Sequence, residues 1–331
     1  MSRLTRRDFL RTALLGAGAV TLGSFLEACG KALATPAAAT RSPAAASATV
    51  PSAGPASSPS PFPDIVVTKG GEPEALVRQA IAALGGMGRF VPKGANVIVK
   101  PNICVAYNTY EYASTTNPWV VGTLVKMAFE AGAGSVKVMD YPFAGTDETG
   151  YQTSGIKEQV EAAGGKMVNM LSYKFKTVNN PKAVVLKSPA VYEDILKADV
   201  LINVPIAKQH SSSRLTLGMK NLMGVVQDRN AMHIRLGQCI ADLNALVRPQ
   251  LTVVDAVRIL TANGPTGGDL ADVKKLDTII ASPDVVAADS YSASLFNYKP
   301  EEIDFIVIGT QMGLGRSDLQ NLKIQTIPVG A

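Results

Sequence analysis

Residues 96–102 read NVIVKPN, a short apolar run that passes directly into a lysine, a proline and an asparagine. Apolar runs of about four to eight residues that are rich in β-branched side chains are typical of buried strands. Similar runs recur along the chain and predict strands at Ile65–Val67, Asn96–Val99, Ser135–Met139, Val184–Leu186, Val200–Val204, Leu251–Val254, Thr278–Ala281 and Phe305–Ile308.

Longer segments with helical spacing of apolar residues lie between these runs. They predict helices at Glu74–Leu84, Pro118–Ala131, Gly155–Ala163, Ala231–Leu246 and Val285–Phe296. The second helix has clear end signals, because Asn117 suits the N-cap, Pro118 the first helical position and Gly132 the C-terminal turn. Alternating strands and helices predict an α/β fold with a mainly parallel sheet and helices on both faces.

The chain begins with a basic segment followed by an apolar one. Arg6 and Arg7 precede Phe9, and Ala13–Leu26 is apolar apart from small residues. The pattern resembles a twin-arginine signal, and the apolar part is too short to favour a permanent membrane span. Residues 1–28 are therefore predicted to be a signal peptide that takes the folded protein to the twin-arginine translocase.

Two cleavage positions are open. Leu26–Gly30 reads LEACG and is similar to a lipobox, in which Cys29 becomes the lipidated N-terminus, although Glu27 is unusual there. Ala32–Ala34 reads ALA, a small-x-small site that would release a protein without Cys29. The first is favoured because the cysteine directly follows the apolar run. It predicts an exported protein on the outer face of the cell membrane or in the periplasm, anchored to the membrane surface through Cys29.

Residues 31–63 consist almost entirely of Ala, Pro, Ser and Thr. Such a composition buries too little apolar surface to offset the entropy of ordering the chain. We therefore expect residues 29–63 to be a linker, which would hold the domain at 64–331 clear of the membrane.

Charge and cysteine content exclude two classes of function. The formal net charge is +5, of which the leader contributes +2, so that +3 remains and no basic run marks the domain. This argues against a nucleic-acid partner. Cys104 and Cys239 lie far apart with no C-x-x-C, so no structural zinc or iron–sulfur cluster is expected from this chain alone. Both are expected to be buried free thiols.

Several predicted strands end in polar residues. In open parallel sheets, ligands bind beyond the carboxyl ends of the strands. The side chains expected at this edge are Lys100, Asn102, Asp140, Asn203 and Asp255. Asp and Asn at strand ends also commonly cap helices or shape turns. A lysine that leaves a buried strand, however, needs a carboxylate, an anion or open solvent beside its ammonium group.

The segment Asn203–His233 contains both histidines of the chain. Lys208 lies two residues before His210, and Lys220-Asn221 follows. A histidine near neutral pH moves protons or binds metals, and an adjacent lysine lowers its pKa by like-charge repulsion. The alternative for His233 is simple packing near a helix start.

Together these segments resemble the DUF362 family. The matching motifs are KPN at 100–102, TTNP at 115–118, Asp140, NVP at 203–205, KQH at 208–210, Thr216, MKN at 219–221 with Gly224, His233, Asp255, GP at 264–265 and Asp284–Asp289. The resemblance covers nearly all of residues 64–331 and implies a fold and recurring positions, but no substrate, because the reaction of the family is undefined.

The chain departs from this resemblance in three respects. Many relatives are associated with ferredoxin-type cysteine motifs, and this chain has none. Asn117 and Gln209 stand where the resemblance leads us to expect His and Thr. A metal site that relied on a histidine at position 117 would therefore be missing.

An exported enzyme of undefined reaction is the first hypothesis. Its predicted catalytic residues are Lys100, Asp140, Lys208, His210, Lys220 and Asp255. The lysines would hold an anionic group of a small molecule, while His210, with one of the aspartates, would move a proton or hold a metal of unknown identity.

A lipid-tethered binding module is the second hypothesis. It would present an anionic ligand, metal or cofactor to another exported protein. The predicted ligand-binding residues are Asn102, Asn203, Asn221 and His233. A third hypothesis is a purely structural envelope protein. Under it, the clustering of these polar side chains would be a coincidence.

Overall fold

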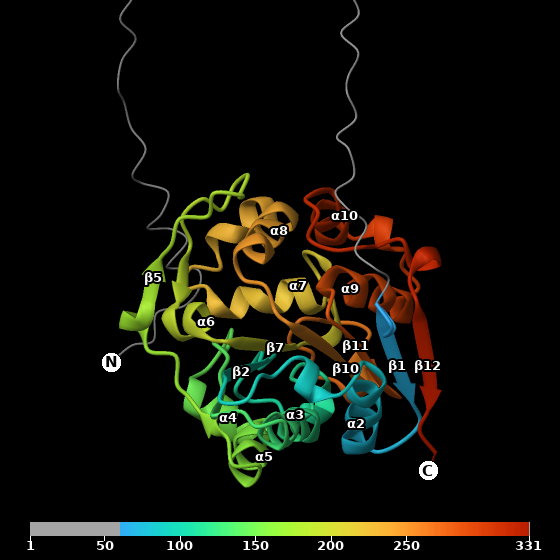
Figure 1. Ribbon diagram of the computed structural model, residues 1–331. Coiled ribbons are helices and arrows are strands. Elements are labelled where there is room, and N and C mark those ends of the chain that lie inside the picture. The colour runs from blue at the N-terminus through green and yellow to red at the C-terminus, as the bar shows by residue number, and fades with distance from the viewer. Residues whose placement is uncertain (1–59, 331) are drawn as a thin grey trace, which may run out of the picture. The chain divides into compact units, whose positions relative to one another are not determined.

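The run at residues 96–99 forms β2 (Asn96–Pro101), which lies inside a ten-stranded sheet in the computed structural model (Figure 1). The structure describes residues 60–330. The predicted leader, Cys29 and nearly all of the predicted linker therefore lie outside the described residues.

The sheet is mainly parallel, as predicted. Its strands follow the order β12 (Ile324–Pro328), β1 (Ile65–Lys69), β11 (Val273–Ser282), β10 (Leu251–Leu260), β7 (Val200–Val204), β2, β3 (Ser135–Val138) and β4 (Lys166–Met167). From β10 to β4 all neighbours are parallel, whereas β11 is antiparallel to both β10 and β1. The parallel strands place their carboxyl ends at one edge.

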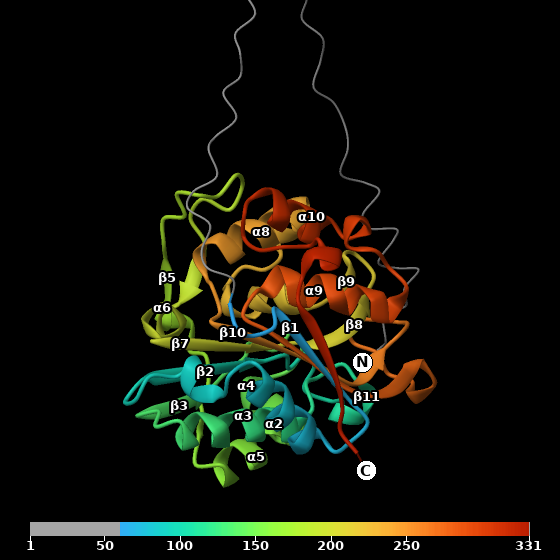
Figure 2. The same ribbon diagram turned by 45° about the vertical axis from the view of Figure 1, so that its right-hand side comes forward.

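A hairpin extends this edge. β8 (Ile206–His210) pairs in parallel with the distal half of β10, and β9 (Arg214–Thr216) folds back antiparallel to β8 (Figure 2). β5 (Phe175–Thr177) and β6 (Ala190–Tyr192) form a separate two-stranded sheet.

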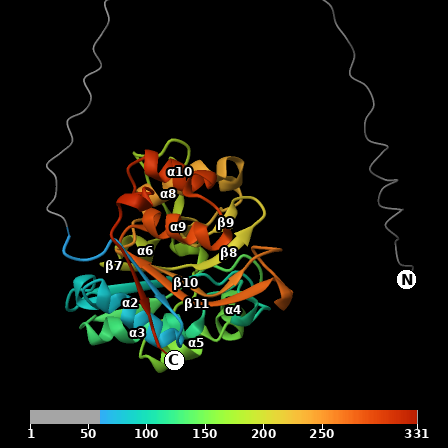
Figure 3. The ribbon, with the colours of Figure 1, turned by 90° about the vertical axis from the view of Figure 1, so that its right-hand side faces the viewer.

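Helices cover both faces of the sheet (Figures 1 and 3). One face carries α2 (Pro73–Ala83), α3 (Pro118–Glu130), α4 (Asp147–Thr153) and α5 (Ile156–Ala162). The other carries α7 (Gly218–Asn221), α8 (Leu236–Leu246), α9 (Val285–Ala293) and α10 (Asp304–Gln311), and α6 (Glu193–Lys197) precedes β7. Successive side chains of a strand point to opposite faces. Val97 and Val99 accordingly pack in the hydrophobic core beneath α2 and α3, and Ile98 packs in the core on the opposite face, beneath α8 and α9.

The end signals of α3 are confirmed. The Asn117 side chain accepts a hydrogen bond from the Trp119 backbone N–H at 3.0 Å, and Pro118 is the first helical residue. Gly132 follows the helix with a φ of +96°, a conformation that favours glycine. The predicted helix at 231–246 is divided into a 3₁₀ turn, η5 (Ala231–Arg235), and α8.

Two predicted strands are wrong. Val184–Leu186 is a loop whose three backbone N–H groups donate to the buried Asp242 carboxylate at 2.6 to 2.9 Å. Phe305–Ile308 belongs to α10, in which Phe305, Ile306 and Gly309 form the buried face. Short apolar runs do not by themselves distinguish a strand from a helix or an anchored loop. In the loop, Val184 is exposed in spite of its apolar side chain.

Cys104 and Cys239 are free and buried, as predicted. Across residues 60–330, the helices are too short or too polar to cross a bilayer.

Candidate functional site

A pocket of about 470 Å³ lies at the carboxyl ends of β2 and β3. The β8–β9 hairpin, α7 and the 3₁₀ turn η4 (Leu222–Val225) complete its walls. This volume is within the range of small-molecule sites. Of the residues predicted from the sequence, those that line the pocket are Asn102, Asp140, Lys208, His210, Lys220, Asn221 and His233.

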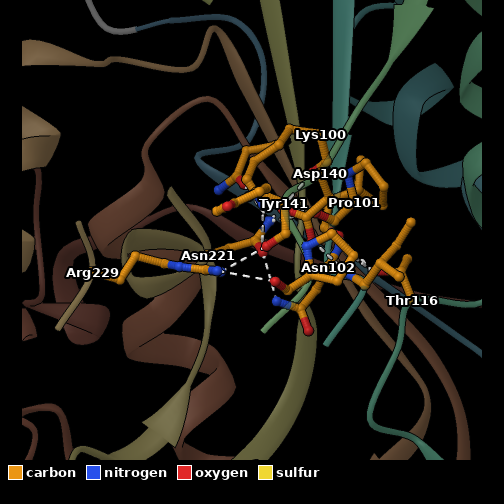
Figure 4. A network of polar contacts seen from close by, with 12 residues as sticks. Lys100, Pro101, Asn102, Thr116, Asp140, Tyr141, Asn221 and Arg229 are labelled. Atoms are coloured by element: carbon orange, nitrogen blue, oxygen red, sulfur yellow. Dashed lines mark hydrogen bonds and ion pairs between the residues drawn. The ribbon is translucent and has the colours of Figure 1, made fainter. Parts of the chain in front are cut away.

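Lys100 lies behind the pocket wall in a buried ion pair with Asp140 (Figure 4). Its ammonium donates to Asp140 Oδ1 at 2.7 Å, to the Pro101 carbonyl at 2.9 Å and to Asn221 Oδ1 at 3.2 Å. The other carboxylate oxygen of Asp140 accepts from the Ile103 backbone N–H at 2.6 Å. Burial lowers the pKa of Lys100, and Asp140 opposes that shift. Both charges are thus satisfied without solvent.

Three asparagines extend this network. Asn102 Nδ2 donates to Asn221 Oδ1 at 2.9 Å, and Asn221 Nδ2 donates to Asn203 Oδ1 at 2.8 Å. Asn203 Nδ2 in turn donates to the Gly218 carbonyl at 2.9 Å. Because Asn203 is fully buried behind Asn221, its role is to hold α7 against the sheet. The predicted ligand-binding asparagines therefore divide into two at the pocket and one beneath it.

The close packing of the turn after α7 explains why position 224 is glycine. A Cβ at this position would overlap Asp140 Oδ1 and would lie 2.7 Å from Lys100 Nζ. The turn after α7 therefore passes directly over the ion pair, and only glycine leaves room for it.

Lys208 and Lys220 differ from Lys100 in having no carboxylate partner. Lys208 Nζ donates to Asn102 Oδ1 at 2.8 Å and to the Ser114 carbonyl at 2.7 Å. Lys220 is only 9% exposed and lines the pocket, and its ammonium group makes no hydrogen bond or ion pair with any residue that the structure describes. Burial and then the charge of Lys208 lower the pKa of Lys220 to about 8. An anion in the pocket would supply the missing counter-charge.

His210 faces the same pocket in a defined tautomer. The Ser212 backbone N–H donates to His210 Nδ1 at 3.0 Å, so a neutral ring carries its proton on Nε2. Burial, followed by the charges of Lys220 and Lys208, lowers the pKa of His210 to about 3. The imidazole is therefore neutral at physiological pH and offers an N–H donor.

Arg229 closes one side of the pocket and was missed by the sequence analysis. Its guanidinium donates to the Tyr141 carbonyl at 2.6 Å and to the Pro142 carbonyl at 3.0 Å, and it lies over the Tyr141 ring. The exposed His233 contacts the Arg229 carbonyl through Nδ1 at 2.9 Å. Nothing in the local sequence marks this arginine, because its carbonyl partners are distant in the chain.

Cys104 also lines the pocket and was predicted only as a buried thiol. It shares the pocket with Lys208 and Lys220 and raises the pKa of both amines, while burial lowers them. The signal that could have identified it is its place two residues after Asn102, immediately beyond the strand end.

Asp255 is not brought to the pocket. Its carboxylate accepts from the backbone N–H groups of Asn117 at 2.7 Å and Val257 at 3.0 Å, and burial raises its pKa to about 6. Gln209 Oε1 accepts from the Gly264 backbone N–H at 2.7 Å. The two departures from the family pattern, Asn117 and Gln209, thus anchor the start of α3 and a loop.

The charges of the pocket suit an anion better than a cation. Within residues 60–330, no three His, Cys, Asp or Glu side chains gather closely enough to hold a metal ion. The Nδ1 lone pair of His210 is already engaged by Ser212. Lys208, Lys220 and Arg229 all line the cavity, while Asp140 is neutralised by its lysine partner and Asp228 is the one other carboxylate of the lining.

Comparisons with known proteins give a family, one curated relative and distant structural likenesses. A model of the DUF362 family, described as a domain of unknown function, matches residues 97–294. A thylakoid-associated protein of Synechocystis sp. is 28% identical over 249 residues, which are 72% of this chain and 75% of that protein.

Among solved structures, the lactate racemase apoprotein of Thermoanaerobacterium thermosaccharolyticum gives a TM-score of 0.47 at 10% identity, over 70% of this chain and 56% of the racemase. A Thermotoga maritima protein gives 0.43 at 12% identity, over 68% and 60%. The chain spans less than two thirds of the length of either structure.

Removing Lys100 should strongly destabilise the fold, because Asp140 would remain buried without its cation. We expect Lys100→Met to lower the free energy of unfolding by about 3–5 kcal/mol, and the double variant Lys100→Met with Asp140→Leu to lose less than Lys100→Met alone. Urea unfolding measures both. Lys197→Met, which breaks an exposed pair with Glu193, is the control and should cost under about 0.5 kcal/mol. A loss below 1 kcal/mol for Lys100→Met would contradict the role of the pair.

The depressed pKa of His210 should make the fold sensitive to acid. The unfolded chain takes up a proton near the ordinary value of 6.5, whereas the folded chain does so only near about 3. The stability that the neutral, buried His210 gives the folded state is therefore fully present above pH 6.5. It is lost as the pH falls toward 3, and the free energy of unfolding decreases by up to about 1.4 kcal/mol per pH unit. Urea unfolding at pH 7, 6 and 5 should show a shallower decline for His210→Gln. Ser211→Ala, in the same turn, should keep the wild-type decline, and equal slopes for His210→Gln and wild type would disprove the assignment.

Proposed function

Given that the chain belongs to the DUF362 family, whose reaction is undefined, we propose that it binds and transforms a small anionic molecule in this pocket. The observation that carries the proposal is Lys220, a lysine more than nine-tenths buried in the cavity wall without a partner among the described residues. Its side chain is withdrawn from water while its amine stays open to the cavity, since Nζ is not one of the buried polar atoms that lack a partner. Partial burial of an ammonium group is costly, and an anionic ligand in the cavity offsets that cost.

The other pocket groups complete the recognition of an anion. Lys208 and Arg229 add positive charge, and His210 Nε2–H adds a neutral donor. In this proposal Lys100 and Asp140 position the wall and do not touch the ligand. His210 acts as a hydrogen-bond donor more than as a base, because its lowered pKa makes it a poor proton acceptor.

A binding module would use the same pocket without converting its ligand. A carrier needs only charge complementarity, whereas this cavity also contains two nucleophiles, the thiol of Cys104 and the amine of Lys220. Nucleophiles held beside an anion-binding group favour an enzyme.

Anion binding should depend on Lys220. We expect inorganic phosphate, oxalate or pyruvate to stabilise the wild-type protein, by about 2.7 kcal/mol at 100 times its Kd. Lys220→Met should weaken that affinity at least tenfold, which is about 1.4 kcal/mol, and should itself raise the stability of the anion-free protein because a buried charge is removed. Calorimetry and urea unfolding measure the two effects.

The control is Lys182→Met, an exposed lysine in a loop, which should leave affinity and stability unchanged. If none of the three anions distinguishes wild type from Lys220→Met, the pocket is not an anion site.

We also propose export by the twin-arginine translocase and anchoring through a lipidated Cys29, on the basis of the leader and linker sequences. Replacing Arg6 and Arg7 by lysine should leave the full-length precursor in the cytoplasm. Cys29→Ala should abolish incorporation of labelled palmitate and move the exported protein from the membrane to the soluble fraction. A mature N-terminus at Thr35 in the wild type would instead show cleavage after Ala34.

A further inference from the structure

We propose that Lys220 is an amine nucleophile that forms an imine with the carbonyl carbon of a small carboxylate-bearing substrate, either a 2-oxo acid or an aldehyde acid. This inference rests on the proposed function, since the same pocket must first hold the anionic group. It adds the class of substrate and the residue that reacts with it.

The three buried lysines of the site are satisfied to different degrees. Lys100 has three acceptors, one of them a carboxylate, and Lys208 has two. Lys220 has none among the described residues and lines the cavity. An amine attacks a carbonyl through its nitrogen lone pair, which is available only when the group is neutral. Of the three, Lys220 is therefore the amine that the surroundings do not hold in the charged form.

The backbone on both sides of Lys220 is fixed. The Asp289 carboxylate accepts from the N–H groups of Gly218 at 2.6 Å and Met219 at 2.8 Å, and Asn244 Nδ2 donates to the Met219 carbonyl at 2.9 Å. Asn221 belongs to the asparagine network. The lysine is thus presented from a rigid support, which lowers the entropic cost of orienting a nucleophile.

The surroundings also favour a neutral amine. The charged and titratable groups that share this pocket are Lys208 and His210 of β8, Cys104 after β2, Asp140 and Tyr141 after β3, and Asp228, Arg229 and His233 after η4. Asp140 is paired with Lys100, and Lys208 and Arg229 repel a charge on Lys220. With a pKa of about 8, about a tenth of the amine is unprotonated at pH 7, far more than for an ordinary lysine with a pKa of about 10.4. Lysines activated by burial and a neighbouring cation form Schiff bases in other enzymes.

The reaction balances without another reagent. The Lys220 nitrogen forms a bond to the carbonyl carbon while one amine proton passes to the carbonyl oxygen, giving a carbinolamine. The hydroxyl then leaves with the second amine proton as water, and a carbon–nitrogen double bond remains. Lys208, Arg229 and the His210 N–H would hold the carboxylate of the substrate during both steps.

Reductive trapping tests this proposal on the full chain. The protein is incubated with pyruvate and sodium cyanoborohydride, digested, and analysed by mass spectrometry for carboxyethyl-lysine. We expect Lys220 to be modified at least tenfold faster than the exposed Lys182 and than Lys208. Oxalate, an anion that forms no imine under these conditions, should protect Lys220, and the trapping rate should rise as the pH passes through about 8, where the amine loses its proton.

Lys220→Arg keeps a cation but cannot form the imine, so the fast adduct should disappear, whereas Lys182→Arg should keep it. Adduct mapping in the wild type is independent of whether either variant folds. If pyruvate and oxalate stabilise the protein yet Lys220 reacts no faster than Lys182, the imine is disproved and anion binding stands. If phosphate binds but pyruvate and oxalate do not, the imine with a 2-oxo acid is disproved and anion binding stands; if none of the three anions binds, both proposals fail.

Discussion

The ion pair between Lys100 and Asp140 is the constraint on which the site depends. Two charges withdrawn from water are stable only when every donor and acceptor finds a partner. Lys100 meets that requirement with acceptors from three segments, and Asp140 meets it with a backbone N–H beyond β2. The ends of β2 and β3 and the helix α7 must therefore converge, and the chain above the pair must be glycine, as it is at Gly224.

This structural network also positions the reactive part of the pocket. Asn221 is bound to Lys100 and two other asparagines, and Lys220 is its neighbour on α7. Successive residues of a helix point about 100° apart, so anchoring Asn221 in the network directs Lys220 elsewhere, into the cavity. Lys100 at the end of β2 is thus fully paired and Lys220 on α7 is not, because the network takes up Asn221 and not its neighbour. The first provides rigidity, and the second provides an amine available for a ligand.

Parallel-sheet topology made much of this edge predictable. The apolar runs that end in Lys100, Asp140 and Asn203 are strands whose carboxyl ends lie together. Asp255 looked equivalent, yet β10 continues to Leu260, so this aspartate lies within a strand and holds the start of α3. Arg229 was not predictable, because its contacts with two carbonyls far away in the chain leave no local pattern.

The sequence by itself determined the alternation of strands and helices, the capping of α3, the polar ends of the strands and membership of the family, because these depend on local periodicity and short motifs. Only the tertiary structure decided that Val184–Leu186 is an anchored loop, that Phe305–Ile308 is helical, and which lysines have partners. The physical reason is that burial and pairing are properties of groups brought together from distant segments. A lysine in a sequence carries the same charge everywhere, and its chemistry is set by the acceptors that the fold places, or does not place, beside it.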